Sequence, residues 1–164
     1  MRGFHITLPT RTFDPEMWLR LGGWEVRLLN LDPTNPVGDG MVQVPSAKVL
    51  FLGELFQNGY FPRVGWRDIR SWIQTLRQLE GWEVELFVPG RGEPSNKQQM
   101  AEFRQFLEWL STEVECRIRE GKPSAQVKRE LNLTEKYPWR ARELAPLAVE
   151  AVYVQLATRQ LQPQ

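Results

Sequence analysis

The order of the apolar segments constrains the fold of this chain most strongly. An apolar run at 47–52 is followed by a segment at 66–79 whose apolar residues recur at three- and four-residue spacing, which is typical of one helix face. These residues are Ile69, Trp72, Leu76 and Leu79. A second apolar run at 82–88 predicts another strand. The sequence therefore predicts a β-α-β unit near the middle of the chain.

Other elements flank this unit on both sides. Two alternating runs within 15–31 surround Gly22-Gly23 and predict a β-hairpin. The remaining predicted elements are a strand at 41–44, an ordered loop at 53–65, and helices at 97–120, 124–131 and 141–158. Strands, then β-α-β, then helices indicate an α+β fold. We expect a single domain over residues 1–159 and a frayed tail at 160–164.

Charge and cysteine content exclude several classes of protein. The chain has 21 basic and 20 acidic residues among 164, so its net charge of +1 gives no reason to expect binding to nucleic acid. No apolar run reaches the roughly 18–20 residues of a membrane helix. A single cysteine, Cys116, excludes an internal disulfide and favours a cytoplasmic location. We expect Cys116 to be a packed small residue of its helix.

The histidine count argues against a zinc enzyme. The chain contains one histidine, His5, which we expect to lie on the surface or to be packed near the terminus. A catalytic zinc site takes about three protein ligands, mostly nitrogen or thiolate. One histidine and one distant cysteine cannot supply them, so we expect no metal and no cofactor. The seven tryptophans indicate either large core residues or an interface.

Three segments carry a resemblance to a known family. Asn35 precedes Gly38-Asp39, Glu54 follows Gly53 at the end of an apolar run, and Arg91 lies within the segment 88–92, Val-Pro-Gly-Arg-Gly. In order and spacing they resemble the second half of the metallo-β-lactamase superfamily, whose strand-Gly-Asp and Pro-Gly-His-Gly motifs supply metal ligands. Segments 121–130 and 149–156 also resemble the C-terminal extension of a hydrolase-like branch.

The resemblance places the metal-ligand positions of the family at Asn35, Glu54 and Arg91, with Asp39 as a candidate neighbour of those positions. A guanidinium has no lone pair to give to a metal. The resemblance therefore implies a degenerate site without metal, cofactor or catalytic residue. Arg91 has two main interpretations, a surface arginine in a turn or a replacement for the metal's charge that pairs with Glu54. Metal binding by Glu54 is a third.

The resemblance also implies an incomplete sandwich. The His-x-His-x-Asp-His motif of the family's first half is absent, and residues 1–13 are too short to hold it. We therefore expect half of an αββα sandwich, a mixed sheet covered by helices. Strands this apolar are normally covered on both faces. The inner face would be covered by a second copy, by another protein, or by the hairpin at 15–31 folding back.

Two functions follow from this interpretation. One is a non-catalytic, metallo-β-lactamase-like subunit that binds another protein chain or a second copy of itself. The other is part of a metal-dependent hydrolase, with the missing histidines supplied by another chain or by an upstream segment. The substituted positions Asn35 and Arg91 favour the first.

Overall fold

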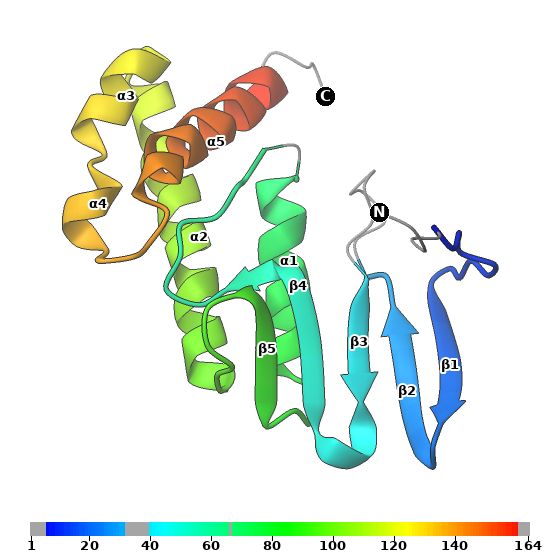
Figure 1. Cartoon of the computed structure of the whole chain (residues 1–164). Helices are drawn as coiled ribbons and strands as arrows, with labels where there is room; N and C mark the ends of the chain where they lie inside the picture. The colour runs from blue at the N-terminus through cyan, green and yellow to red at the C-terminus, as the bar shows by residue number, and fades with distance from the viewer. Residues whose placement is uncertain (1–5, 32–39, 66, 161–164) are drawn as a thin grey trace.

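The computed structural model describes residues 6–31, 40–65 and 67–160, and within them the chain forms one mixed sheet of five strands. The strands lie in chain order across the sheet, β1-β2-β3-β4-β5 (Figure 1). They are β1 (Glu16–Leu21), β2 (Trp24–Leu29), β3 (Met41–Val44), β4 (Val49–Gln57) and β5 (Leu86–Arg91). Neighbours are antiparallel except β4 and β5, which are parallel. The expected α+β fold with a mixed sheet is confirmed.

The α-helices lie to one side of the sheet; α1 comes between β4 and β5 in the chain, and the others follow β5. They are α1 (Ile69–Glu80), α2 (Lys97–Arg119), α3 (Ser124–Glu130), α4 (Leu133–Lys136) and α5 (Ala145–Gln160). Short 3-10 helices, η1 (Pro45–Ala47) and η2 (Arg142–Leu144), precede β4 and α5. Figure 1 shows α1 and α2 behind β4 and β5, whereas the β1–β2 hairpin extends beyond the helices.

Local capping sets where the two long helices begin. Asp68 accepts a hydrogen bond from the Ser71 backbone N–H, so α1 begins three residues later than the expected start at 66. At α2, Asn96 and Gln99 form a reciprocal capping box, which fixes the predicted start at residue 97. The predicted end of α2 at 120 is one residue too late.

The core lies between the sheet and the helices. Phe103 and Phe106 of α2 meet Phe56 and Phe61 edge to face, with ring centroids 5.7 and 6.2 Å apart respectively. The Trp139 ring lies 4.7 Å from that of Phe106 and joins the segment before α5 to the same cluster. Edge-to-face aromatic contacts are favourable in addition to the area they bury. The cluster therefore fastens the C-terminal helices to the sheet.

β4 and β5 differ at both ends from the strands predicted at 47–52 and 82–88. The segment at 53–57, expected to be loop, continues β4 as far as Gln57. A register shift against β5 occurs at Gly53, whose φ of +51° accommodates the irregularity. The strand expected at 82–88 begins only at Leu86, because a turn in which the Val84 N–H donates to the Trp82 carbonyl oxygen comes first.

The C-terminal region also differs from its prediction. The last helix, expected at 141–158, begins at Ala145, with Ala141 in a left-handed conformation before η2. The short helix α4 has no counterpart among the predicted elements.

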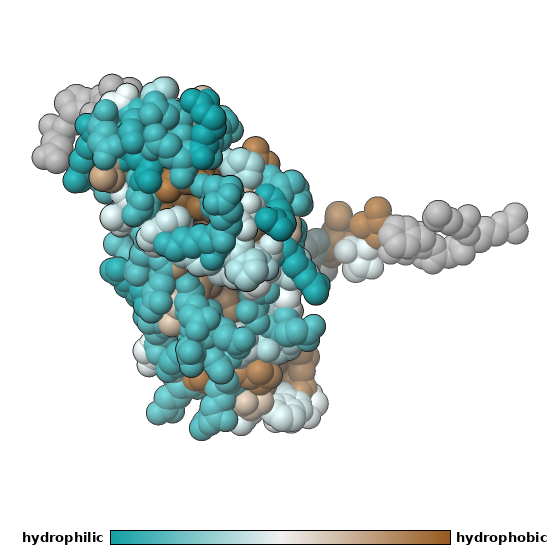
Figure 2. All heavy atoms as spheres, turned by 90° about the vertical axis from the view of Figure 1, so that its left-hand side faces the viewer, coloured by the Kyte–Doolittle hydropathy of each residue, from teal (hydrophilic) through white to brown (hydrophobic). Residues whose placement is uncertain are grey.

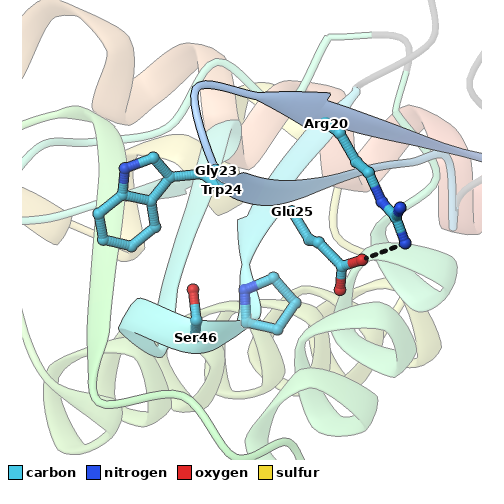
Figure 3. A pocket seen from close by; sticks show the side chains of 6 residues that line it. Arg20, Gly23, Trp24, Glu25 and Ser46 are labelled. Carbon is cyan, nitrogen blue, oxygen red and sulfur yellow. Dashed lines mark hydrogen bonds and ion pairs between the residues drawn. The ribbon is translucent and has the colours of Figure 1, made fainter.

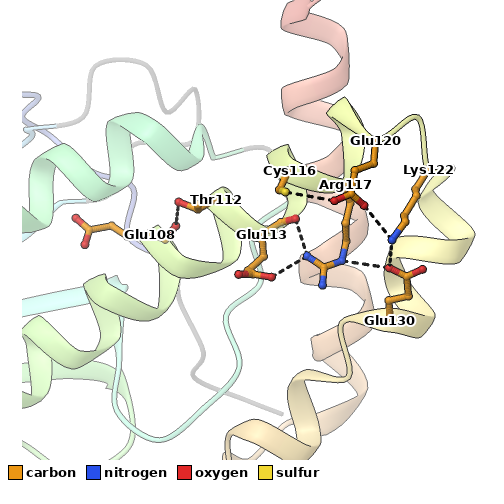
Figure 4. A network of polar contacts seen from close by, with 8 residues as sticks. All are labelled: Glu108, Thr112, Glu113, Cys116, Arg117, Glu120, Lys122 and Glu130. Carbon is orange, nitrogen blue, oxygen red and sulfur yellow. Dashed lines mark hydrogen bonds and ion pairs between the residues drawn. The ribbon is translucent and has the colours of Figure 1, made fainter.

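Cys116 is exposed, so its prediction as a packed residue is wrong. Its thiol lies 3.5 Å from Glu120, in a chain of polar contacts that links the end of α2 to α3 (Figure 4).

The hairpin extends the sheet and does not fold back over it. Trp18 and Trp24 are exposed, whereas Trp72 is fully buried, so the tryptophans divide between surface and core. The side of the molecule on which α2, α3 and α4 lie is mostly hydrophilic (Figure 2). None of the described helices combines the length and apolarity that a bilayer-spanning segment requires.

Candidate functional site

Glu54 and Arg91 meet where the two parallel strands end. Because β4 and β5 are parallel, their carboxyl ends lie at the same edge of the sheet. Arg91 Nε lies 3.7 Å from Glu54 Oε1, and Gln57 donates from Nε2 to Glu54 Oε2 at 2.9 Å. The Glu54 and Arg91 side chains are 47% and 39% exposed. The predicted proximity of this pair is confirmed, but the pair is open to solvent.

Two glycines allow the strand ends to approach so closely. A Cβ at Gly90 would lie 2.6 Å from the Gly53 carbonyl oxygen, and one at Gly92 would lie 2.1 Å from that of Asn58. Gly92 also has a φ of +96°. The Asn58 backbone N–H donates to the Arg91 carbonyl oxygen at 2.9 Å across this contact. The backbone at 90–92 is therefore held against β4 independently of the Arg91 side chain.

A second arginine, Arg67, contacts the backbone of Glu54. Arg67 is almost fully buried and donates from Nη1 to the Glu54 carbonyl oxygen at 3.0 Å. Its guanidinium also stacks over the Trp72 ring at 4.4 Å, and the Trp72 indole N–H donates to the Leu55 carbonyl oxygen. These contacts tie the start of α1 to the end of β4. Sequence reasoning missed both Arg67 and Gln57, because neither belongs to a recognisable pattern.

The other residues proposed from the resemblance lie outside the described part of the chain. These are Asn35 and Asp39, and the same holds for His5. Within residues 6–31, 40–65 and 67–160, no three histidine, cysteine, aspartate or glutamate side chains gather in a way that could hold a metal ion. The described part of the site thus consists of an ion pair and an amide.

The two faces of the sheet differ sharply in chemistry. One row of paired residues on the helix side runs Trp18, Arg27, Gln43, Leu50, Phe87. Its members on β4 and β5, Leu50 and Phe87, are buried under the helices. On the hairpin this side carries charged residues that pair with one another, Arg20 with Glu25 and Arg27 with Glu16.

The opposite face, here called the open face, is apolar across every strand. One complete row of paired residues runs Met17, Leu28, Val42, Phe51, Val88. The remaining side chains of this face are Leu19, Leu21, Trp24, Val26, Val44, Val49 and Leu86. None of these residues is buried. An antiparallel sheet normally presents polar residues to water, so the open face has the composition of a covered surface.

The open face contains a hollow near the hairpin end. Its volume is about 340 Å³, and its lining is wholly apolar. The lining residues are Leu21, Trp24, Val26, Val44, Ala47, Val49 and Phe51. Trp24 and Phe51 are 53% and 42% exposed. A neighbouring polar hollow of about 490 Å³ lies between the hairpin and η1, where the Arg20–Glu25 pair points away from Trp24 (Figure 3).

Another cluster of charged residues lies at the far end of α2 (Figure 4). Arg117 contacts Glu113 and Glu130, and Lys122 contacts Glu120 and Glu130. Hydrogen bonds from Lys122 lower the pKa values of both Glu120 and Glu130. Two cations and three carboxylates pair within this cluster, which therefore acts as a surface link between α2 and α3.

Comparison with known proteins identifies the fold. No protein-family model and no curated protein matches the chain. Among solved structures, a metallo-β-lactamase family protein from Thermus thermophilus matches 95% of this chain with a TM-score of 0.65 and 16% identity. The sec-alkylsulfatase Pisa1 from Pseudomonas sp. matches 93% with a TM-score of 0.64, also at 16% identity. A metallo-β-lactamase from Pontibacter korlensis matches 62% with a TM-score of 0.54 and 20% identity.

The chain spans half or less of each of these proteins. It covers 50% of the Thermus thermophilus chain, 28% of the sulfatase chain and 50% of the Pontibacter korlensis chain. The identities are too low to transfer an activity, but the similarity covers the sheet and the helices together. The chain therefore has a metallo-β-lactamase-like fold, of which it contains a five-stranded mixed sheet and the helices on one side of it.

Proposed function

We propose that this chain is a non-catalytic, metallo-β-lactamase-like protein that acts as an interaction or structural subunit of a larger assembly. The observation that carries the proposal is the open face. An apolar surface that crosses all strands of a sheet costs free energy in water and favours association with a partner. The charged residues of the hairpin lie on the helix side of the sheet. The open face therefore carries no charged side chain.

The absence of catalysis is supported by the chemistry of Glu54 and Arg91. In the family resemblance, both lie at positions of metal ligands, together with Asn35. A guanidinium 3.7 Å from a carboxylate supplies positive charge where the resemblance expects a metal. It cannot coordinate a metal or activate a water molecule in the way that a bound cation does.

Elemental analysis tests the non-catalytic part of the proposal. The protein should be purified without chelator, dialysed, and analysed for transition metals together with an Arg91→His variant. We expect far less than one metal ion per chain in the unaltered protein. About one zinc per chain that survives dialysis would instead support the metal-dependent hydrolase.

Sedimentation and affinity capture test the interaction part. We expect the chain of 19.2 kDa to sediment as a larger species at micromolar concentration, or to bind a partner that a variant with a charged open face no longer binds. Leu86→Lys is a suitable variant because Leu86 lies at the exposed border of the sheet. A monomer with no partner that depends on the open face would contradict this role.

A further inference from the structure

We propose that the occupant of the open face is a second copy of this chain, packed sheet against sheet about a two-fold axis that runs along β3. This inference rests on the interaction role proposed above and specifies the partner. Sheets that pack face to face lie about 10 Å apart, and their inner side chains interdigitate. The central strand of each copy would then lie opposite the central strand of the other.

The absence of charge on the open face makes self-association feasible. A two-fold interface brings the same surface of both copies together, so any charge near the axis would face an identical charge. Every open-face side chain is apolar, and the nearby charges are directed to the other side of the sheet. Arg27 and Glu16 pair there with each other, as do Arg20 and Glu25. Self-association would therefore bury no unpaired charge.

The shape of the open face is compatible with packing against the open face of a second copy. Trp24 and Leu21 are exposed at the hairpin end and line the apolar hollow together with Val44 and Val49. A two-fold axis along β3 places the hairpin of each copy over β4 and β5 of the other. The large side chains of one copy would then lie near Val49 and Leu86 of the second.

The size of the open face comes close to what a dimer needs. Twelve side chains, on strands about 4.8 Å apart and in rows about 6.7 Å apart along each strand, cover about 390 Å². Two such faces bury about 770 Å² in projection. The loops around the face would supply the rest of the roughly 1,000 Å² that a specific interface needs.

Cross-linking along β3 tests the geometry. In a Cys116→Ser background, Val44→Cys places a thiol on the open face near the proposed axis, whereas Gln43→Cys places one on the opposite face of the same strand. A short bis-maleimide should join two Val44→Cys chains and leave Gln43→Cys chains largely unjoined. Equal cross-linking of both variants would overturn the proposal.

Sedimentation velocity from about 1 to 100 µM tests the affinity. Val44→Glu should raise the dimer dissociation constant at least about 100-fold, because it buries a charge without a partner. Leu86→Lys provides a second variant at the exposed border in case Val44→Glu does not fold, and circular dichroism checks both. The control, Gln43→Glu, should leave the dimer unchanged. A dimer insensitive to both open-face variants would overturn the proposal.

The outcomes separate this inference from the proposed function. A monomer that binds a different protein through the open face overturns the second copy as occupant but leaves the interaction role in place. A monomer at all concentrations without such a partner overturns both. A dimer that loses its stability with open-face charges and cross-links through Val44→Cys supports both.

Discussion

Arg91 Nε lies 3.7 Å from Glu54 Oε1, and both side chains are more than a third exposed. A pair this open gains little Coulomb energy, because water screens both charges. The positions of the two strand ends come instead from the backbone, where Gly90 and Gly92 lie against Gly53 and Asn58. The ion pair therefore lies on a scaffold that does not depend on it.

Arg91→Ala should accordingly lower the free energy of unfolding by less than about 1 kcal/mol. Urea denaturation at neutral pH measures this, with Arg91→Lys as the variant that keeps the charge. A loss of several kcal/mol would mean that the pair is far more shielded from water than its exposure indicates.

Gly92→Ala should destabilise the protein much more than Arg91→Ala. The new Cβ would meet the Asn58 carbonyl oxygen at 2.1 Å, and the backbone φ of +96° is unfavourable for alanine. Strain of this kind costs about 1–3 kcal/mol even without a clash. Gly81→Ala is the matched control, because Gly81 has a φ of −76° and a Cβ there would be 3.4 Å from its nearest neighbour. Thermal unfolding should separate the two variants clearly.

Arg104 joins the two long helices, and its replacement by glutamine should cost about 1–3 kcal/mol. Its guanidinium lies 2.5 Å from both Glu80 of α1 and Glu108 of α2, and its side chain is only 13% exposed. Without Arg104, Glu108 keeps its contact with Arg77 at 2.6 Å, whereas Glu80 loses both hydrogen bonds that Arg104 donates to it.

Arg119→Gln is the control for Arg104→Gln. Arg119 pairs with Glu115 one helical turn away in an exposed position of the same helix, so its loss should cost less than about 0.5 kcal/mol. Urea denaturation of both variants gives the comparison. Equal losses would show that helix propensity, and not the link between α1 and α2, controls the result.

How well the sequence predicted an element depended on whether local signals were complete. α2 was predicted almost to the residue, because a long apolar stripe lies behind the capping pair of Asn96 and Gln99. β5 was placed four residues too early. Trp82 and Val84 alternate like a strand, but they belong to a turn whose Val84 side chain reaches the core. Alternation alone does not distinguish these two cases.

Features that depend on distant partners were harder to predict. β4 continues beyond Gly53 because β5 pairs with it, although glycine favours a break locally. The proximity of Glu54 and Arg91 followed from the family resemblance, whereas Gln57 and Arg67 depend on tertiary packing and leave no pattern in the sequence. The open face was anticipated only as an uncovered inner face. Its continuation across the hairpin required the register of β1 and β2.

Acid should destabilise the protein mainly below pH 4.5, which is the ordinary pKa of its glutamates. Burial raises the pKa of Glu108, but hydrogen bonds from Arg104 and Arg77 outweigh it and leave that pKa lowered. The pKa values of Glu16 and Glu130 are lowered by hydrogen bonds from Arg27 and Lys122. A carboxylate with a lowered folded-state pKa stabilises the protein above its unfolded pKa. It loses that contribution as the pH falls through the folded value.

Urea denaturation at pH values from 3 to 7 measures this loss. We expect a nearly constant free energy of unfolding between pH 5 and 7 and a steady fall below pH 4.5. Glu108→Gln should have a shallower fall than the unaltered protein, because one of the carboxylates that becomes protonated is gone. High salt should reduce the contribution of the exposed pairs more than that of Glu108, since exposed charges are screened more strongly. A free energy of unfolding that rises on acidification would contradict the lowered pKa values, because protonation would then favour the folded state.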